Sequence, residues 1–202
     1  MKKFVITIGR EFGSLGRPVA RRLAELLGVS YYDRDILEAT SRMMNLPVSV
    51  LGDQEEYRKN SFWRMVVPLG TESSDQQNRV FEVQCKIIAK LAATESCVIV
   101  GRCADYVLRD DPNAIHVYIY APKEARLENC INSLGMDRAE ARKMIREVDK
   151  ARLNYHRHYA GYAPGDPKYK HIIINSSLLG VEGTARALAA ITKAKFGEAD
   201  DE

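Results

Sequence analysis

The sequence predicts an α/β fold with three layers, in which helices cover both faces of a five-stranded parallel sheet. Five short apolar segments alternate along the chain with helical patterns, and this alternation favours parallel strands joined by helices. The first apolar segment leads directly into a glycine-rich turn and an amphipathic helix. With 202 residues, 46% of them hydrophobic, the chain is long enough to bury a sizeable core as one domain over 1–202.

The first strand and helix are expected within residues 4–27. Strand 4–9 is almost entirely apolar, and residues 16–27 follow as a helix because apolar side chains recur there at helical spacing. Pro18 is tolerated near the start of this helix, since the first N–H groups of a helix have no intrahelical partner. Gly28 is placed to end it.

The next part of the chain is less regular. A short strand at 29–32 leads to Asp33, which is placed to cap a helix over about 34–44. Glycine, proline, serine and threonine interrupt residues 45–75, where we expect short helices and a mobile loop. A clear helical pattern returns over about 76–94.

The second half of the chain repeats the alternation of strands and helices. Apolar runs predict strands at 97–102, 115–120 and 171–175. The composition of residues 160–170 indicates a loop. The expected helices are 122–134, opened by Pro122, then 137–159, as one long charged helix or a helix pair, and finally 181–195.

Composition and charge restrict the class of partner. The net charge of +3 is too small to indicate a nucleic-acid or membrane partner. No apolar run approaches the roughly 20 residues that a transmembrane helix needs. The N-terminus begins like a signal peptide, but Arg10 and Glu11 interrupt it, so we expect a cytoplasmic protein. The four cysteines show no C-x-x-C pair and no metal-ligand spacing, as is typical of buried thiols in a reducing compartment.

The glycine-rich turn after the first strand predicts a variant phosphate-binding loop. The standard loop is G-x-x-x-x-G-K-[ST], whereas here Glu11 replaces the first glycine, Arg17 the lysine and Pro18 the hydroxyl residue. The alternative is an ordinary turn followed by a surface arginine. Arg10 and Glu11 would either form ion pairs or place Glu11 on a metal. The residues predicted to bind phosphate are Gly13, Ser14, Leu15, Gly16 and Arg17.

Further polar residues follow other predicted strands. Because ligands of open parallel sheets bind beyond the carboxyl ends of the strands, the glycine turn, Asp33 and the Gly101-Arg102 pair indicate a site at that edge. Arg102 needs a partner for its charge, either an anionic substrate or Asp33. Asp105 would orient Arg102 or cap a helix.

The charged helix at 137–159 allows two interpretations. Four cations at spacings of four share one stripe, with Asp149 and Arg152 beside them. They form either a solvated helix face or a flap whose arginines close over phosphates. The stripe consists of Arg138, Arg142, Arg146 and Lys150. The aromatic run of Tyr155, His156, His158 and Tyr159 is interpreted as surface or packing residues, because histidines two apart on a helix face different directions.

Five segments of the chain together resemble one known family. They read IGREFGSLGR, YYDRDIL, VIVGRCADYVL, VDKARLNYHRHY and YKHIIINSSLLGVEG, in that order. In these segments the chain resembles the cytidylate kinase-like family, which comprises relatives of the P-loop nucleoside-monophosphate kinases. The resemblance extends over about residues 3–192 and is weakest from 45 to 80.

This resemblance implies a P-loop kinase fold with ATP as phosphoryl donor, Mg²⁺, and a nucleoside monophosphate as acceptor. It implies a core at 1–44, 76–135 and 160–197, an acceptor-binding region at about 33–75, and a helical lid at about 136–160. Gly101-Arg102 matches a pair that holds the acceptor, and Asp149-x-x-Arg152 resembles a lid motif. The expected catalytic residues are Arg17, Arg102 and Arg152. The expected acceptor-binding residues are Asp33, Arg102, Asp105, Asp149 and Arg152, and no metal ligands are assigned.

The expected reaction is therefore phosphoryl transfer from ATP to a nucleoside monophosphate, with CMP or dCMP first in order. Such transfer depends on positioning and electrostatics rather than on a covalent intermediate. Two alternatives stay open: a small-molecule kinase that needs a base such as Asp33 for an alcohol, or a nucleotide-binding protein weakened in catalysis by Pro18 and the missing lysine. The expected partner is the nucleotide substrate, without nucleic acid or membrane. The oligomeric state is open, and a homodimer is one arrangement that the sequence allows.

Overall fold

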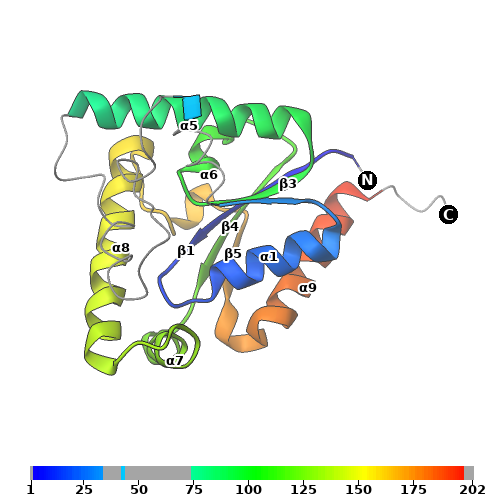
Figure 1. Cartoon of the computed structure of the whole chain (residues 1–202). Coiled ribbons are helices and arrows are strands. Elements are labelled where there is room, and N and C mark those ends of the chain that lie inside the picture. Colours follow the sequence, from blue (N-terminus) through cyan, green and yellow to red (C-terminus); the bar gives the residue numbers. More distant parts are fainter. Residues whose placement is uncertain (1, 34–41, 44–73, 198–202) are drawn as a thin grey trace.

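A single parallel sheet forms the centre of the molecule (Figure 1). The structure, a computed structural model, describes residues 2–33, 42–43 and 74–197. Its described strands pair in the order β2-β3-β1-β4-β5, all parallel, so the predicted five-stranded parallel sheet is confirmed. The strands are β1 (Val5–Arg10), β2 (Ser30–Tyr32), β3 (Cys97–Val100), β4 (Ala114–Tyr120) and β5 (Ile172–Asn175).

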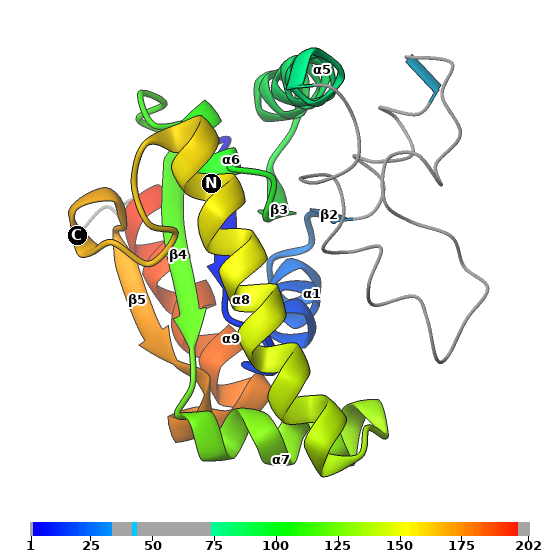
Figure 2. The same cartoon turned by 90° about the vertical axis from the view of Figure 1, so that its left-hand side faces the viewer.

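Helices cover both faces of this sheet (Figures 1 and 2). On one face α1 (Gly16–Leu27) and α9 (Ser176–Phe196) pack on the sheet around Ile6, Leu23 and Leu188, which are buried. On the other face α5 (Ser74–Thr94) and α6 (Ala104–Val107) pack around Ile88 and Ile99. The predicted layering of helix, sheet and helix is therefore present.

Two further helices lie at the end of the sheet where β1 finishes (Figure 1). They are α7 (Lys123–Leu134) and α8 (Arg138–Ala160), which pack on each other and on Phe12. The segment predicted as one helix or a pair is a single helix. Asp137 caps its start by accepting hydrogen bonds from the N–H groups of Ala139 and Glu140, each 2.8 Å away. This places α8 alongside the carboxyl edge of the sheet.

Two boundaries differ from the predicted ones. The last helix begins at Ser176 instead of residue 181, because Asn175 caps it and a kink at Gly180 separates its first turn from the rest. The third strand ends at Val100, because the backbone turns away there with positive φ angles. The predicted helix at 34–44 lies mostly, and the segment 45–73 wholly, outside the described residues.

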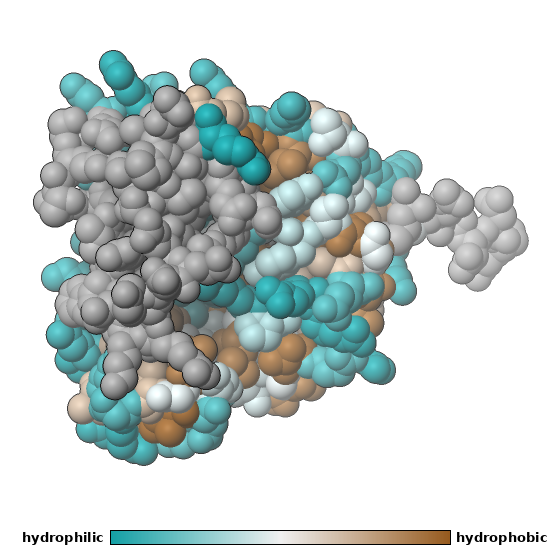
Figure 3. Space-filling view, viewed as in Figure 1, coloured by the Kyte–Doolittle hydropathy of each residue, from teal (hydrophilic) through white to brown (hydrophobic). Residues whose placement is uncertain are grey.

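The surface of the described part is mixed in character. On the face shown in Figure 3, hydrophilic residues cover most of the described surface, and hydrophobic residues form smaller patches scattered between them. In the part of the chain that the structure describes, no helix combines the length and apolar character needed to cross a bilayer.

Candidate active site

The turn between β1 and α1 has the geometry of an anion-binding loop. Gly13 and Leu15 adopt positive φ angles of 77° and 57°, and α1 then begins at Gly16 without a side-chain cap. The first N–H groups of a helix have no intrahelical partner, so those at the start of α1 are available to an anion. The Ser14 hydroxyl donates to the carbonyl oxygens of Glu11 (3.0 Å) and Ile119 (3.2 Å), so this hydroxyl holds the shape of the loop.

Arg126, a buried arginine on α7, contacts the phosphate loop. The Arg126 guanidinium forms an ion pair with Asp149 of α8 and lies 3.4 Å from a Glu11 carboxylate oxygen. The other carboxylate oxygen of Asp149 accepts a hydrogen bond from the Phe12 amide at 2.8 Å. The sequence allowed either an ion pair or a metal-binding role for Glu11. The ion pair is present, and its partner is Arg126. Sequence reasoning missed Arg126, whose only signal is its position four residues before the buried Cys130 on the inner face of the helix.

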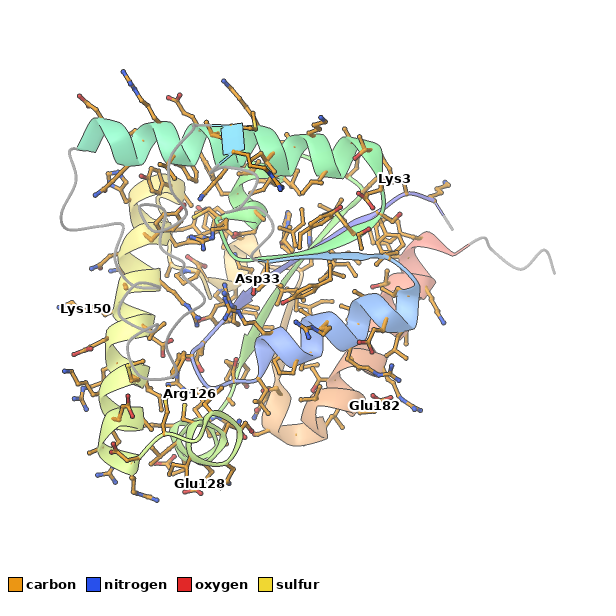
Figure 4. All side chains as sticks on the ribbon, viewed as in Figure 1. Lys3, Asp33, Arg126, Glu128, Lys150 and Glu182 are labelled. Carbon is orange, nitrogen blue, oxygen red and sulfur yellow. The ribbon has the colours of Figure 1, made fainter. Side chains whose placement is uncertain are left out.

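Asp33 at the end of β2 is held by the loop arginine. Its carboxylate lies 2.6 Å from Arg17 Nε and 3.9 Å from the nearer Arg10 nitrogen, and it accepts a hydrogen bond from the Tyr31 hydroxyl at 3.4 Å. Figure 4 shows Asp33 between the phosphate loop and β2. The sequence offered Asp33 as a partner for Arg102, but the carboxylate is instead held by Arg17. This ion pair links the predicted donor and acceptor sides of the site.

The turn after β3 is the second strained segment at this edge. Gly101, Arg102 and Cys103 all have positive φ angles, of 76°, 58° and 53°. Non-glycine residues adopt this conformation at a cost of order 1 kcal/mol each, and such strain clusters at functional sites. Within the described residues, the non-glycine residues with positive φ are Leu15, Arg102 and Cys103, and all of them lie in the two turns that face the site.

Arginines from four different segments line one pocket at this edge. Arg152 of α8 donates a hydrogen bond to the Arg10 carbonyl oxygen at 3.0 Å, which joins the helix to the end of β1. Burial lowers the pKa of Arg152 to about 10, although the charge of Asp149 opposes the shift. The described residues that line the pocket include Arg10, Arg17, Arg102, Arg152, Tyr155 and Asp105. Such a concentration of cations suits a ligand with several negative charges.

Asp105 makes different contacts from those predicted. Its carboxylate accepts hydrogen bonds from His156 (3.1 Å), the Tyr162 hydroxyl (3.1 Å) and the Lys170 ammonium (2.5 Å), and not from Arg102. It does not cap α6 either, since the capping position is Cys103. Burial alone would raise the pKa of Asp105, but the hydrogen bond and charge of His156, with the charge of Lys170, hold that pKa well below its usual value.

The aromatic end of α8 was interpreted from the sequence as surface or packing residues. His156 is 6% exposed, so the packing interpretation holds for this residue. The Tyr155 hydroxyl donates to the buried Gln84 of α5 at 3.2 Å, and Phe81 stacks on Tyr159. These contacts fix the face of α8 that lines the pocket.

The cationic stripe of α8 points away from the pocket. Its members Arg138, Arg142, Arg146 and Lys150 are all exposed, and Figure 4 shows Lys150 directed outward. Of the two interpretations of this stripe, the solvated face is the one observed. Asp149 and Arg152 lie on the inner side of the same helix and form hydrogen bonds to the loop and to the end of β1.

The described residues offer few groups for a metal ion. They contain no cluster of three or more histidine, cysteine, aspartate or glutamate residues that could hold one. Pro18 occupies the position whose hydroxyl binds Mg²⁺ in a standard loop. The carboxylates of Glu11, Asp33 and Asp149 are each paired with an arginine. A complete Mg²⁺ site made of protein groups is therefore not present in this part of the chain.

Comparison with known proteins agrees with this geometry. A cytidylate kinase from Methanopyrus kandleri is 27% identical over 196 residues, which cover 92% of this chain and 91% of that protein. The crystal structure of an uncharacterized protein from Eubacterium ventriosum matches with a TM-score of 0.68 and 28% identity, over 97% of this chain and 100% of that one. A shikimate kinase from Bacteroides thetaiotaomicron, 12% identical, matches with a TM-score of 0.53 over 94% and 98% of the two chains, which supports the P-loop kinase fold. The profile of the cytidylate kinase-like family matches residues 5–178. The chain therefore belongs to the cytidylate kinase-like family of kinases.

Proposed function

We propose that this protein transfers the γ-phosphoryl group of ATP to a nucleoside monophosphate, with CMP or dCMP as the first acceptors to test. The observation that carries the proposal is the set of arginines from four segments around one pocket, next to an uncapped helix N-terminus. The name of the Methanopyrus kandleri relative, a cytidylate kinase, supports cytidylate as the acceptor. The reaction would take place in the cytoplasm, where ATP and Mg²⁺ are supplied.

The donor phosphates would bind at the loop. The N–H groups at the start of α1 would hold the β-phosphate, and the Arg17 guanidinium would turn from Asp33 to the γ-phosphate. Arg152 lies at the boundary of loop and pocket and would stabilise the charge that develops during transfer. Asp149 would keep α8 attached to the loop through Phe12.

The acceptor would bind at the ends of β2 and β3. Arg102 would hold its phosphate, and Asp33, once released by Arg17, would contact the rest of the acceptor. A phosphate acceptor is already ionised and needs no base, whereas an alcohol does. Asp105 is held in hydrogen bonds to three partners and is not placed as a free base. The arginines that line the pocket match a phosphate-bearing acceptor better than a neutral alcohol. Both features favour a monophosphate over an alcohol.

Mg²⁺ would enter with the nucleotide. It would neutralise charge on the donor phosphates, and it commonly keeps several waters and few protein ligands. Because Pro18 supplies no hydroxyl and the neighbouring carboxylates are paired with arginines, the described residues do not fit a dedicated Mg²⁺ site. The arginines are the described groups that would bind the phosphates directly.

A second candidate is a nucleotide-binding protein with little or no transfer activity. The ion pair between Arg17 and Asp33 supports this candidate. The pair joins a residue of the donor site to a residue of the acceptor site, and it must break before both substrates can bind. Pro18 in place of a hydroxyl residue supports it as well. The strained turn at Arg102 favours the kinase instead, since it brings a further arginine to the pocket beside the phosphate loop, where an acceptor phosphate would bind.

A substrate panel tests the proposal. Wild-type protein with ATP and Mg²⁺ is offered CMP, dCMP, UMP, AMP, GMP, cytidine and simple polyols, and ADP formation is followed. We expect turnover with at least one monophosphate and none with cytidine. Arg102→Met should raise KM for that monophosphate by roughly 10-fold or more, because a hydrogen bond to a charged group is lost. The control is Arg109→Met, an exposed arginine a few residues on. Tight ATP binding without turnover on any compound would leave the binding-protein candidate instead.

A further inference from the structure

The last residue of β1, Arg10, lies between the phosphate loop and the turn that carries Arg102. We propose that Arg10 binds the phosphate of the acceptor, beside Arg102, and so helps to restrict the acceptor to phosphate-bearing compounds. This inference rests on the proposed function, since it names a further residue of the same site. The argument comes from the space around Arg10, from its missing partner and from the charges near it.

Two glycines make room for the Arg10 side chain. A Cβ atom at Gly16 would lie 2.6 Å from the Arg10 Cβ, and a Cβ at Gly101 would lie 2.4 Å from the Arg10 Nη1. Any other residue at either glycine would displace this arginine. The stem of Arg10 therefore lies against the loop while its guanidinium lies against the turn before Arg102, which places the charge on the acceptor side.

The Arg10 guanidinium has no close partner among the residues that the structure describes. Its side chain is 13% exposed, its nearest carboxylate oxygen belongs to Asp33 at 3.9 Å, and its Nε is buried without a hydrogen bond. A buried charge that lacks hydrogen bonds is costly, and a bound anion would offset that cost. Asp33 itself is already bound by Arg17 at 2.6 Å.

The charges around Arg10 point to an anion as the missing partner. Its backbone carbonyl accepts a hydrogen bond from Arg152, and Arg17 and Arg102 line the same pocket. Burial, together with the neighbouring charge of Arg152, holds the pKa of Arg10 well below its usual value. A dianionic phosphate placed among these cations would pair with the Arg10 fork and relieve their mutual repulsion.

The comparison with a standard phosphate loop also supports a role for Arg10 at the acceptor. In a standard loop a lysine reaches the β- and γ-phosphates. Here Arg17 takes that place, but its guanidinium reaches across to Asp33. Arg10, which comes from the strand instead of the helix, adds a cation that a standard loop does not place at the end of β1. It would face the acceptor phosphate while Arg17 serves the donor.

The test compares Arg10→Met and Arg10→Lys with wild type and with Arg142→Met, which removes an exposed arginine on α8. Calorimetry gives Kd for CMP, cytidine, ATP and inorganic sulfate, and steady-state assays give KM and kcat. For Arg10→Met we expect CMP binding to weaken by roughly 10- to 100-fold, with ATP and cytidine binding changed by less than about 3-fold. Arg10→Lys keeps the charge but not the fork, and it should recover part of the loss.

Thermal stability separates a binding role from a structural one. If Arg10 serves to bind a ligand, then the ligand-free Arg10→Met variant should have the same Tm as wild type or a higher one, because an uncompensated buried charge is lost. A structural arginine would instead lower Tm in Arg10→Met and leave CMP binding as in wild type, and that result would overturn the inference. CMP turnover with an unchanged KM in a folded Arg10→Met would overturn it too, while the proposed function would stand. No turnover on any monophosphate, with sulfate binding lost only in the Arg10 variants, would reject the proposed function and retain Arg10 as an anion site.

Discussion

Asp149 of α8 accepts a hydrogen bond from the backbone amide of Phe12, 2.8 Å away, and so attaches the helix to the phosphate loop. The same carboxylate pairs with the buried Arg126 of α7, which also donates to the Phe12 carbonyl oxygen at 3.3 Å. Loop, α7 and α8 are therefore one connected unit, and a change in the position of α8 must be felt at the loop.

Replacement of Asp149 tests this connection. Asp149→Asn keeps a hydrogen-bond acceptor for Phe12 but removes the charge that compensates Arg126, so we expect the free energy of unfolding to fall by about 1–3 kcal/mol. ATP binding should weaken as well, because the loop loses its support. Urea denaturation and calorimetry measure the two effects. The control is Lys150→Gln at the neighbouring exposed position, and equal stability of the two variants would contradict the account.

Arg17 is expected to be required for transfer. Arg17→Ala removes the cation at the lysine position of the loop, and loss of one such group commonly costs roughly 100-fold or more in kcat. It also frees Asp33 from its 2.6 Å ion pair. The measurement is kcat for the best monophosphate, with Arg21→Ala as the control one helical turn away, where the side chain packs over Tyr31. An unchanged kcat in Arg17→Ala would remove this residue from the site.

The buried group around Asp105 is expected to contribute to stability. Asp105→Asn leaves the Lys170 ammonium, whose side chain is 1% exposed, without its charge partner. Removal of one member of a buried pair typically costs about 3–5 kcal/mol. The double variant with Lys170→Met removes the stranded charge and should recover part of that loss. Urea denaturation of the single and double variants decides, and strictly additive destabilisation would show that the pair is not coupled.

The lowered pKa of His116 predicts a loss of stability in mild acid. Burial, assisted by the neighbouring His171, lowers the pKa of His116 to about 4, against about 6.5 in the unfolded chain. Between these values the unfolded chain binds more protons, so the free energy of unfolding falls as pH falls from about 6.5 to about 4, by up to ~3 kcal/mol. Denaturation at pH 7.5 and 5 measures the slope. His116→Gln should flatten it, and an equally steep slope in that variant would refute the assignment.

The fold and the two turns at the strand ends were predictable because their signals are local. Strand, glycine turn and helix follow one another within residues 4–27, and Gly101-Arg102 follows an apolar strand directly. Each of these signals depends on neighbours in the sequence, and a parallel sheet brings the strand ends to one edge. The positions of the loop and of Arg102 at the pocket follow from that arrangement.

The contacts between side chains were less predictable, because they join residues far apart in the chain. Arg126 meets Phe12, and Lys170 and His156 meet Asp105, without any pattern that links them in sequence. Whether Asp33 pairs with Arg17 or with Arg102 depends on how far each guanidinium reaches once the backbone is placed. The early start of the last helix depends on the Asn175 cap, a signal that the weaker helical pattern before Gly180 obscured.

The most direct measurement of the central claim is the identification of the phosphorylated product. Wild-type protein is incubated with ATP, Mg²⁺ and CMP, and the nucleotides are separated by anion-exchange chromatography. The account predicts that CDP, or the diphosphate of another monophosphate in the panel, accumulates in equal amount to ADP. ADP without any nucleoside diphosphate from the acceptor, or no consumption of ATP that nevertheless binds tightly, would contradict it.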